Sequence, residues 1–146
     1  MPGSILLCTD GSDLSITALR AGLAVVRPDA EVIIATVTAA ADPMLVTGTG
    51  FAGGTMSPED YEQHERGLEA ESHAVLQRTA EALGVEASKG VVLRGDAGAT
   101  ICEFAEAQGV EAIILGSRGH GGLKRAILGS VSDHVVRNAP CPVIVA

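Results

Sequence analysis

The chain has 146 residues, a length typical of one domain, with 18 acidic and ten basic residues and a formal net charge of −8. This charge repels nucleic acid, and an aromatic content of 2% leaves few rings for base stacking, so DNA or RNA binding is not expected. No apolar run approaches the roughly 20 residues of a membrane span, and no basic leader precedes the first apolar stretch, which predicts a cytoplasmic protein without a membrane partner.

Five short apolar runs alternate with four stretches of helical character. The runs do not alternate strictly with polar residues, which is typical of strands buried on both faces of a parallel sheet. The predicted strands are Ser4–Thr9, Glu31–Val37, Ala87–Leu93, Ala112–Gly116 and Pro142–Val145. The predicted helices are Asp13–Val26, a helix from Pro58 that Ser57 caps and Gly84 closes, Ala97–Gln108 before a Gly109 cap, and Ser130–Asn138. This order predicts a single doubly wound, Rossmann-like α/β domain over residues 1–146.

The segment Thr38–Met56, between the second strand and the second helix, is too long for an ordinary connection. Its four glycines lead us to expect a flexible insert. Residues 48–53 match G-x-G-x-x-G, but a dinucleotide-binding motif follows a strand directly and opens a helix, and this one starts eleven residues after Val37. We therefore interpret the match as loop sequence.

A second glycine-rich segment has the features of a phosphate site. Gly116 ends the fourth strand and Gly119 follows it, and after nine intervening residues come Gly129 and Ser130, where the fourth helix starts. Glycine lets backbone amides approach a phosphate closely and adopt positive φ values, and a helix N-terminus presents free amides to the same anion. The alternative is a mobile loop closed by Ser130 as an ordinary helix cap.

The charge distribution around this segment also favours an anionic ligand. Residues 112–132 contain no Asp or Glu, although a random distribution would place about two or three there. The same window holds Arg118, Lys124 and Arg125. Arg118 is the best candidate for a direct phosphate contact, whereas the other two bases could be solvated.

On these residues the chain resembles the universal stress protein family, specifically the branch whose members bind ATP. The resemblance covers nearly the whole chain. It is carried by Ile5–Ser12, the Leu93–Gly95 turn, the G-x2-G-x9-G-S motif at Gly116, Gly119, Gly129 and Ser130, and the Asn138–Val143 segment. It implies a five-stranded sheet of order 3-2-1-4-5, with the ligand in the crevice between the first and fourth strands.

The resemblance also implies which residues contact the nucleotide. Thr9 and Asp10 would meet its ribose and adenine side, and Val37 would contact adenine through backbone groups. The ribose and phosphate side would comprise Leu115, Gly116, Arg118, Gly119, Gly129, Ser130, Val131 and Ser132. The implied ligand is ATP, ADP or AMP, with Mg²⁺ or Mn²⁺ bridging the phosphates. From the residues alone, Asp10 could instead be a turn residue, and Val37 a core residue.

Three functions remain open: a nucleotide-binding stress-response regulator read by an unknown partner, a slow ATPase or nucleotide hydrolase, and a structural dimer that binds no nucleotide. The chain has no G-x-x-x-x-G-K-S/T motif, and neither His120 nor His134 has an identifiable orienting partner, so no catalytic residue is assigned. Members of the family pair through the fifth strand, which implies a homodimer through Val143, Ile144 and Val145. The alternative is an edge too short to pair and blunted by Pro142.

The three cysteines are far apart in the sequence and form no CxxC pair, so neither a disulfide framework nor a zinc site is predicted. We interpret Cys8 and Cys102 as core residues. Cys141, between two prolines, could be exposed, but nothing near it in the sequence would lower its pKa.

Overall fold

The computed structural model describes residues 3–39, 57–86, 89–117 and 129–146. Its elements in chain order are β1 (Ser4–Cys8), α1 (Asp13–Leu23), β2 (Glu31–Thr38), α2 (Pro58–Leu83), β3 (Gly90–Arg94), α3 (Ala97–Gln108), β4 (Ala112–Leu115), α4 (Ser130–Asn138) and β5 (Val143–Val145). The G-x-G-x-x-G match at 48–53, Arg118 and Gly119 lie outside the described residues.

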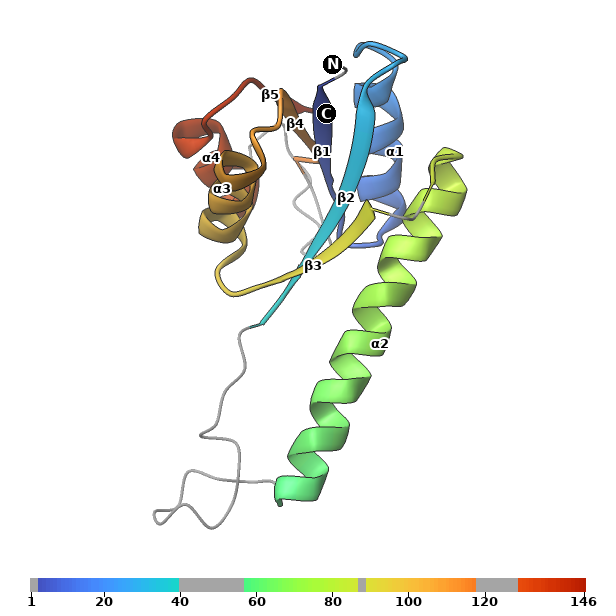
Figure 1. The fold of residues 1–146 in the computed structure, drawn as a ribbon, viewed down its shortest axis with the longest axis vertical. Coiled ribbons are helices and arrows are strands. Elements are labelled where there is room, and N and C mark those ends of the chain that lie inside the picture. The colour runs from blue at the N-terminus through green and yellow to red at the C-terminus, as the bar shows by residue number, and fades with distance from the viewer. Residues whose placement is uncertain (1–2, 40–56, 87–88, 118–128) are drawn as a thin grey trace.

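The strands form one parallel sheet in the order β3-β2-β1-β4-β5. In its register, Ile5 of β1 lies opposite both Val32 of β2 and Ala112 of β4, so β1 is the central strand. Helices α1 and α2 cover one face of the sheet, and α3 and α4 cover the other (Figure 1). This arrangement confirms the predicted doubly wound fold.

The central strand contributes side chains to both faces of the sheet, which explains its continuous apolar sequence. Leu6 packs with Ile101 on the α3 side, whereas its neighbour Leu7 packs with Leu19 on the α1 side. Both leucines have an exposed fraction of 0%. Burial of each such side chain contributes roughly 1.5–3 kcal/mol.

Capping residues set the ends of the longest helix, as the sequence predicts. At the start of α2, Ser57 Oγ accepts a hydrogen bond from the Asp60 amide at 3.1 Å. At its end, Gly84 adopts the left-handed conformation with φ of 69°. Gly109 closes α3 in the same way, with φ of 62°. Such conformations carry no steric cost at glycine.

Some element boundaries differ from the prediction. Helix α1 ends at Leu23 rather than Val26, because the amides of Val25 and Val26 bond three residues back instead of four, to Gly22 O at 3.2 Å and Leu23 O at 3.4 Å. Strand β3 begins at Gly90 rather than at residue 87. Thr38, expected in the insert, is the last residue of β2.

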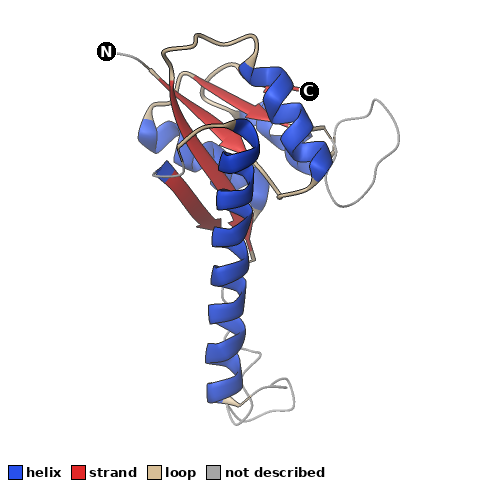
Figure 2. Ribbon diagram, turned by 90° about the vertical axis from the view of Figure 1, so that its right-hand side faces the viewer, coloured by secondary structure: helices blue, strands red, loops and turns tan. Residues whose placement is uncertain are grey.

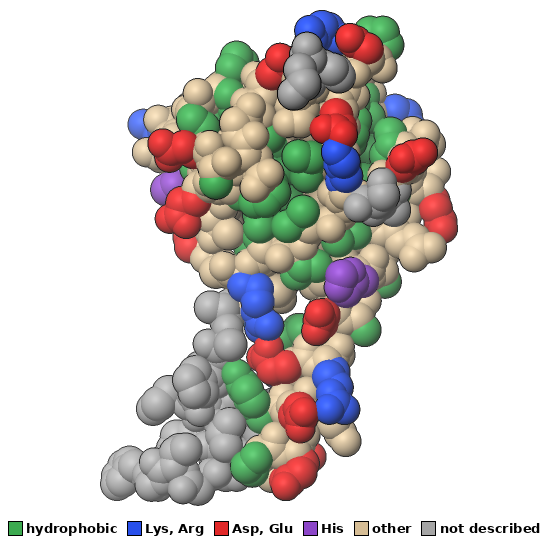
Figure 3. All heavy atoms as spheres, in the orientation of Figure 1, with side chains coloured by type: hydrophobic (Ala, Val, Ile, Leu, Met, Phe, Trp, Pro, Cys, Tyr) green, Lys and Arg blue, Asp and Glu red, His purple; other side chains and the backbone are tan. Residues whose placement is uncertain are grey.

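Helix α2 projects well beyond the sheet (Figures 1 and 2). Its buried residues all lie in its C-terminal half: Ser72, Leu76, Thr79 and Ala80. The projecting half carries charged side chains of both signs (Figure 3), including an exposed Glu62–Arg66 pair at 2.8 Å. No helix in the described ranges combines the length and apolarity needed to cross a bilayer.

Candidate functional site

The sheet has a topological switch point between β1 and β4. From β1 the chain continues through α1 to β2 on one side, and from β4 it continues through α4 to β5 on the other. In open parallel sheets, ligands bind in the crevice outside the carboxyl ends of two such strands. Asp10 follows β1 and Gly116 follows β4, so the fold brings these two predicted site residues to the same edge.

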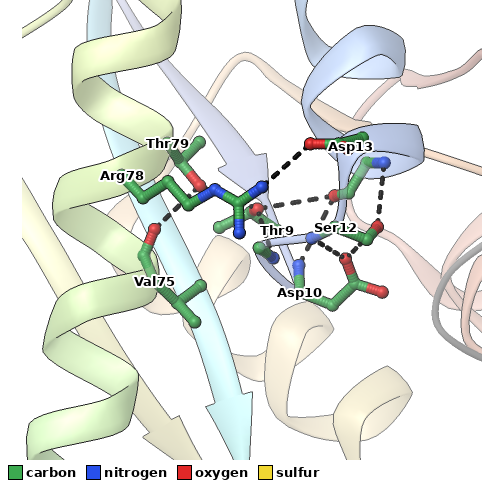
Figure 4. A network of polar contacts seen from close by, with 9 residues as sticks. Thr9, Asp10, Ser12, Asp13, Val75, Arg78 and Thr79 are labelled. Carbon is green, nitrogen blue, oxygen red and sulfur yellow. Dashed lines mark hydrogen bonds and ion pairs between the residues drawn. The ribbon is translucent and has the colours of Figure 1, made fainter.

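Asp10 forms the turn between β1 and α1 (Figure 4). Its Oδ1 accepts hydrogen bonds from the amide of Ser12 at 2.9 Å and from the hydroxyl of Ser12 at 2.6 Å. The same hydroxyl accepts from the Ser15 amide at 3.1 Å and thereby caps α1. Asp10 is therefore a turn residue, which is one of the two roles that the sequence allowed for it. Its role toward a ligand stays a prediction.

The hydroxyl of Thr9 is directed into the protein rather than toward solvent, and Thr9 is only 6% exposed. Its Oγ1 lies 3.0 Å from Thr79 Oγ1 and accepts from the Gly11 amide at 3.0 Å and from Ser15 Oγ at 3.4 Å. One donor and two acceptor positions are all that a hydroxyl offers. Any ligand contact of Thr9 therefore involves its backbone.

Gly11 is required by the geometry of this turn. Its φ is +80°, and a Cβ at this position would lie 2.9 Å from Cγ2 of Val75 on α2. An L side chain would thus meet both a disfavoured backbone conformation and a steric clash. The β1–α1 turn is consequently pressed against α2.

Val37 turns its backbone polar groups toward the crevice. The bond from the Thr9 amide to Ala35 O, at 2.9 Å, lies at the end of the β1–β2 pairing. Thr38 O accepts from the Gly95 amide on the β3 side at 3.0 Å, and the groups of successive residues alternate in direction. The N–H and C=O of Val37 therefore face the β1 side, beyond the point where β1 has ended.

The side chains of Val37 and Leu115 belong to the core on the α3 side of the sheet. Leu115 is 3% exposed, and its carbonyl oxygen accepts from the Ala146 amide at 3.2 Å. The Val37 side chain is partly buried and packs against this core, so its core interpretation holds in part. The buried side chain of Leu115 is not available to a ligand in the crevice.

Backbone bonds hold the start of α4 beside the end of β4. The Gly129 amide donates to Ser117 O at 3.2 Å, and the Ser117 amide donates to Ala146 O at 3.1 Å. Helix α4 then begins at Ser130 without a side-chain cap, since Gly129 occupies the cap position. The sequence alternative in which Ser130 itself caps the helix is wrong.

The first turn of α4 offers the amides of Ser130, Val131 and Ser132, which have no partner within the helix. Their orientation and the helix dipole favour an anion at this point. Ser130 and Val131 are exposed, whereas Ser132 is 2% exposed and its hydroxyl donates to Gly129 O at 3.1 Å. Ser132 would therefore offer its amide rather than its hydroxyl.

The expected positive φ values are not found at the two described glycines of the motif. Gly129 is extended, with φ of −67° and ψ of 166°, and Gly116 is not among the described glycines with positive φ. The amides here are oriented by the helix start and by the Gly129–Ser117 bond. The remaining role of these two glycines is that, without a side chain, they allow a phosphate to approach the backbone closely.

The histidine of α4 is packed against the neighbouring helix. A Cβ at Gly98 of α3 would lie 2.7 Å from Cγ of His134, so the imidazole rests directly on the Gly98 backbone. His120 lies outside the described residues. Among the residues described, no three His, Cys, Asp or Glu side chains form a group that could hold a metal ion.

The cysteines are free thiols, with Cys8 and Cys102 buried and Cys141 half-buried. Burial raises the pKa of all three, that of Cys8 to about 12. A thiol must ionise to act as a nucleophile, so these groups are poorly reactive.

Sequence reasoning missed Thr79, whose hydroxyl joins α2 to the Asp10 turn. A threonine within a helix of 26 residues carries no sequence signal of such a contact. Only the packing of α2 against the β1–α1 turn brings Thr9 and Thr79, seventy residues apart, into contact.

Many solved structures resemble this fold, and three of them serve as examples. Protein MJ0577 of Methanocaldococcus jannaschii has a TM-score of 0.74 at 27% identity, and the match covers 100% of this chain and 96% of that one. A universal stress protein solved in complex with cAMP has a TM-score of 0.62 at 21% identity, with 99% and 96% of the two chains covered. An Arabidopsis thaliana protein of the same family, solved with AMP bound, has a TM-score of 0.62 at 19% identity, with 99% and 90% covered.

Curated relatives match over nearly the full length of the chain. Universal stress protein YxiE of Bacillus subtilis is 33% identical over 150 aligned positions, with 99% of both chains covered. Universal stress protein MJ0531 of Methanocaldococcus jannaschii is 32% identical over 145 positions, covering 97% of this chain and 79% of that protein. The sequence model described as "Universal stress protein family" matches residues 1–146. With the doubly wound sheet described above, these matches show that the chain belongs to the universal stress protein family.

Proposed function

We propose that this protein binds an adenine nucleotide, ATP in the first place, in the crevice between β1 and β4. The observation that carries the proposal is the N-terminus of α4, where the cap residue Gly129 has no side chain and backbone bonds hold the helix start beside the carboxyl end of β4. A polyphosphate is the kind of group that free amides at a helix start bind. Relatives of the same fold, solved with AMP and with cAMP, support an adenine nucleotide as the ligand that carries this phosphate.

The phosphates would lie against the amides of Ser130, Val131 and Ser132. Gly116 and Gly129 would permit close approach, and Arg118 and Gly119, outside the described residues, would complete the phosphate contacts. The absence of acidic residues from 112 to 132 supports this side of the site.

The nucleoside would lie across the ends of β1 and β2. The N–H and C=O of Val37 face that space and match the acceptor and donor on the Watson–Crick edge of adenine. The carboxylate of Asp10 would accept hydrogen bonds from ribose hydroxyls, and Thr9 would contribute backbone. Leu115 would contribute through its main chain at the end of β4.

A divalent cation, Mg²⁺ or Mn²⁺, would be held through the phosphates in this site, since the described residues supply no metal-ligand cluster. Its charge would offset that of the phosphates. The described residues of the chain would thus contribute amides and hydroxyls around the anion.

Nucleotide occupancy would serve regulation in the cytoplasm during stress, with a partner reading the bound and free conformations. The protein would act as a homodimer through β5, the sheet edge next to β4. A slow ATPase is the second reading, although the described part of the site displays no general base: the imidazole of His134 rests on Gly98.

Calorimetric titration of nucleotide-free protein with ATP, ADP, AMP and cAMP tests the proposal. We expect saturable binding of at least one of them at one site per chain. Incubation with labelled ATP separates the two readings, because the regulator should not release phosphate over many binding lifetimes. Absence of binding for all four nucleotides would contradict the proposal.

A further inference from the structure

A chain of buried hydroxyl groups connects the Asp10 turn to helix α2 (Figure 4). The Asp10 amide donates to Ser15 Oγ at 3.4 Å, and that hydroxyl donates to Thr9 Oγ1 at 3.4 Å. Thr9 Oγ1 lies 3.0 Å from Thr79 Oγ1, which donates to Val75 O at 2.9 Å. This series of hydrogen bonds thus begins at the candidate site and ends on the backbone of α2.

The direction of the bond between the two threonines follows from the other bonds. Thr79 has one hydroxyl proton, and that proton is directed to Val75 O. Thr9 Oγ1 already accepts from the Gly11 amide and from Ser15 Oγ. Thr9 therefore donates to Thr79, and each hydrogen bond in this series points along it toward α2.

Burial makes this arrangement specific. Thr9, Ser15 and Thr79 are 6%, 4% and 0% exposed, so water does not readily replace a missing partner. Without the acceptor on Thr79, the Thr9 proton loses its partner and the hydroxyl must reorient. Reorientation would disturb the bond that Thr9 Oγ1 accepts from the Gly11 amide, and with it the turn that holds the Asp10 amide and carboxylate.

The same turn of α2 also presses on the other side of the loop. Gly11 lies against Val75, where a Cβ would come within 2.9 Å of Cγ2. Arg78, between Val75 and Thr79, pairs with Asp13 of α1 at 2.8 Å, although this pair is exposed. One turn of α2 thus contacts the β1–α1 loop through packing, a buried hydroxyl and a surface ion pair.

We propose that Thr79 is a positioning residue of the nucleotide site: as the acceptor of the Thr9 proton, it fixes the Asp10 turn in its ligand-ready geometry and couples the position of α2 to nucleotide affinity. The proposal rests on the proposed function, because it assigns Asp10 to the ribose. It differs from a merely structural role in predicting an effect on the affinity of the folded protein.

The test compares Thr79→Val with Thr79→Ser. Valine keeps the shape of threonine but accepts no hydrogen bond, whereas serine keeps the hydroxyl. We expect Thr79→Val to weaken ATP binding roughly tenfold by calorimetry, and Thr79→Ser to stay within about twofold of the parent. Leu83→Ala is the matched control, since it trims an apolar side chain at the last residue of α2 and leaves the hydroxyl bonds and the Val75–Thr79 turn that contacts the β1–α1 loop in place, so its ATP affinity should stay at the parent value.

A second readout needs no nucleotide. Hydrogen exchange followed by NMR reports on the Gly11 amide, whose acceptor is Thr9 Oγ1. In ligand-free Thr79→Val this amide should exchange at least about tenfold faster than in Leu83→Ala at equal global stability. If the parent protein bound none of the four nucleotides, the proposed function would be wrong, and the exchange rate at Gly11 would still show whether Thr79 holds the Asp10 turn. Parent-like ATP affinity or parent-like exchange at Gly11 in Thr79→Val overturns the role of Thr79.

Discussion

The backbone amide of Gly129 donates to the carbonyl oxygen of Ser117 at 3.2 Å, and this bond fixes the start of α4 beside the end of β4. It is independent of side chains, and the φ of −67° at Gly129 is accessible to any L residue. Neither this bond nor the backbone conformation at position 129 therefore requires glycine. This separates the stability of the fold from the accessibility of the candidate phosphate site.

Substitutions of Asp10 distinguish its turn role from its ligand role. Asp10→Ala removes the acceptor of both Ser12 bonds and should lower the free energy of unfolding by about 1 kcal/mol. Asp10→Asn keeps an oxygen for those bonds and should stay within about 0.5 kcal/mol of the parent. Both should weaken ATP binding, because a carboxylate binds ribose hydroxyls more strongly than a neutral group. Urea unfolding and calorimetry measure the two effects. Unchanged ATP affinity in both variants would leave Asp10 as a turn residue only.

The buried thiol of Cys8 gives the stability a dependence on alkaline pH. Its pKa is about 12 in the folded protein against 9.0 for the free side chain, so above about pH 9 the unfolded chain loses a proton that the folded protein keeps. Below about pH 9 the protonated Cys8 thiol makes its full contribution to the free energy of unfolding. As the pH rises from 9 toward 12 this contribution is lost, at a slope on the order of 1 kcal/mol per pH unit.

Urea unfolding from about pH 8 to about pH 10.5 should therefore give a steeper loss of stability in the parent than in Cys8→Ala. The comparison concerns slopes, because the variant also loses packing at every pH. Parallel profiles for the two proteins would show that Cys8 does not titrate as its burial requires.

Gly98 permits the close packing of α3 on α4. Gly98→Ala should lower the free energy of unfolding by about 1–3 kcal/mol, because its Cβ would overlap the imidazole of His134. The double variant with His134→Ala should recover part of this loss, since the overlapping ring is gone. Urea midpoints of the four proteins of this cycle give the coupling. Strictly additive effects would contradict a direct contact.

The proposed dimer can be tested by removing one outward-facing amide of β5. Pro142 O and the Ala146 amide bond to β4, so by alternation Val143 and Val145 turn their backbone groups to the open edge. Val145→Pro should leave the pairing with β4 intact and shift a dimer toward monomer. Light scattering across micromolar concentrations measures the mass. A parent protein that is monomeric throughout would exclude the dimer.

The sequence predicts this fold well because its signals are local. Apolar runs mark buried strands, and Ser57 and Gly84 mark the ends of α2 through bonds to residues within one turn. The position of the candidate site also follows, since strand order alone brings Asp10 and Gly116 to one edge.

What the sequence could not predict depends on contacts between distant segments. The bond between Thr9 and Thr79 exists only because α2 packs on the β1–α1 turn. The extended conformation of Gly129 likewise follows from its bond to Ser117 and its place ahead of α4, not from its being glycine. In both cases the residue type permits several roles, and tertiary packing selects one.

The most direct measurement of the central claim is the ATP-induced change in melting temperature of Gly129→Val. In the parent, ATP at about 100 times its dissociation constant should stabilise the fold by roughly 2.7 kcal/mol, a melting shift of roughly 5 to 10 °C for a chain of this size. Valine at position 129 places a side chain where phosphate must approach the amides, so the shift should fall to near zero, while the melting point without ATP moves by less than the shift that is lost. Gly67→Val on α2, where nothing lies within 4 Å of an added Cβ, should keep the full shift. A full ATP-induced shift in Gly129→Val would contradict phosphate binding at the start of α4.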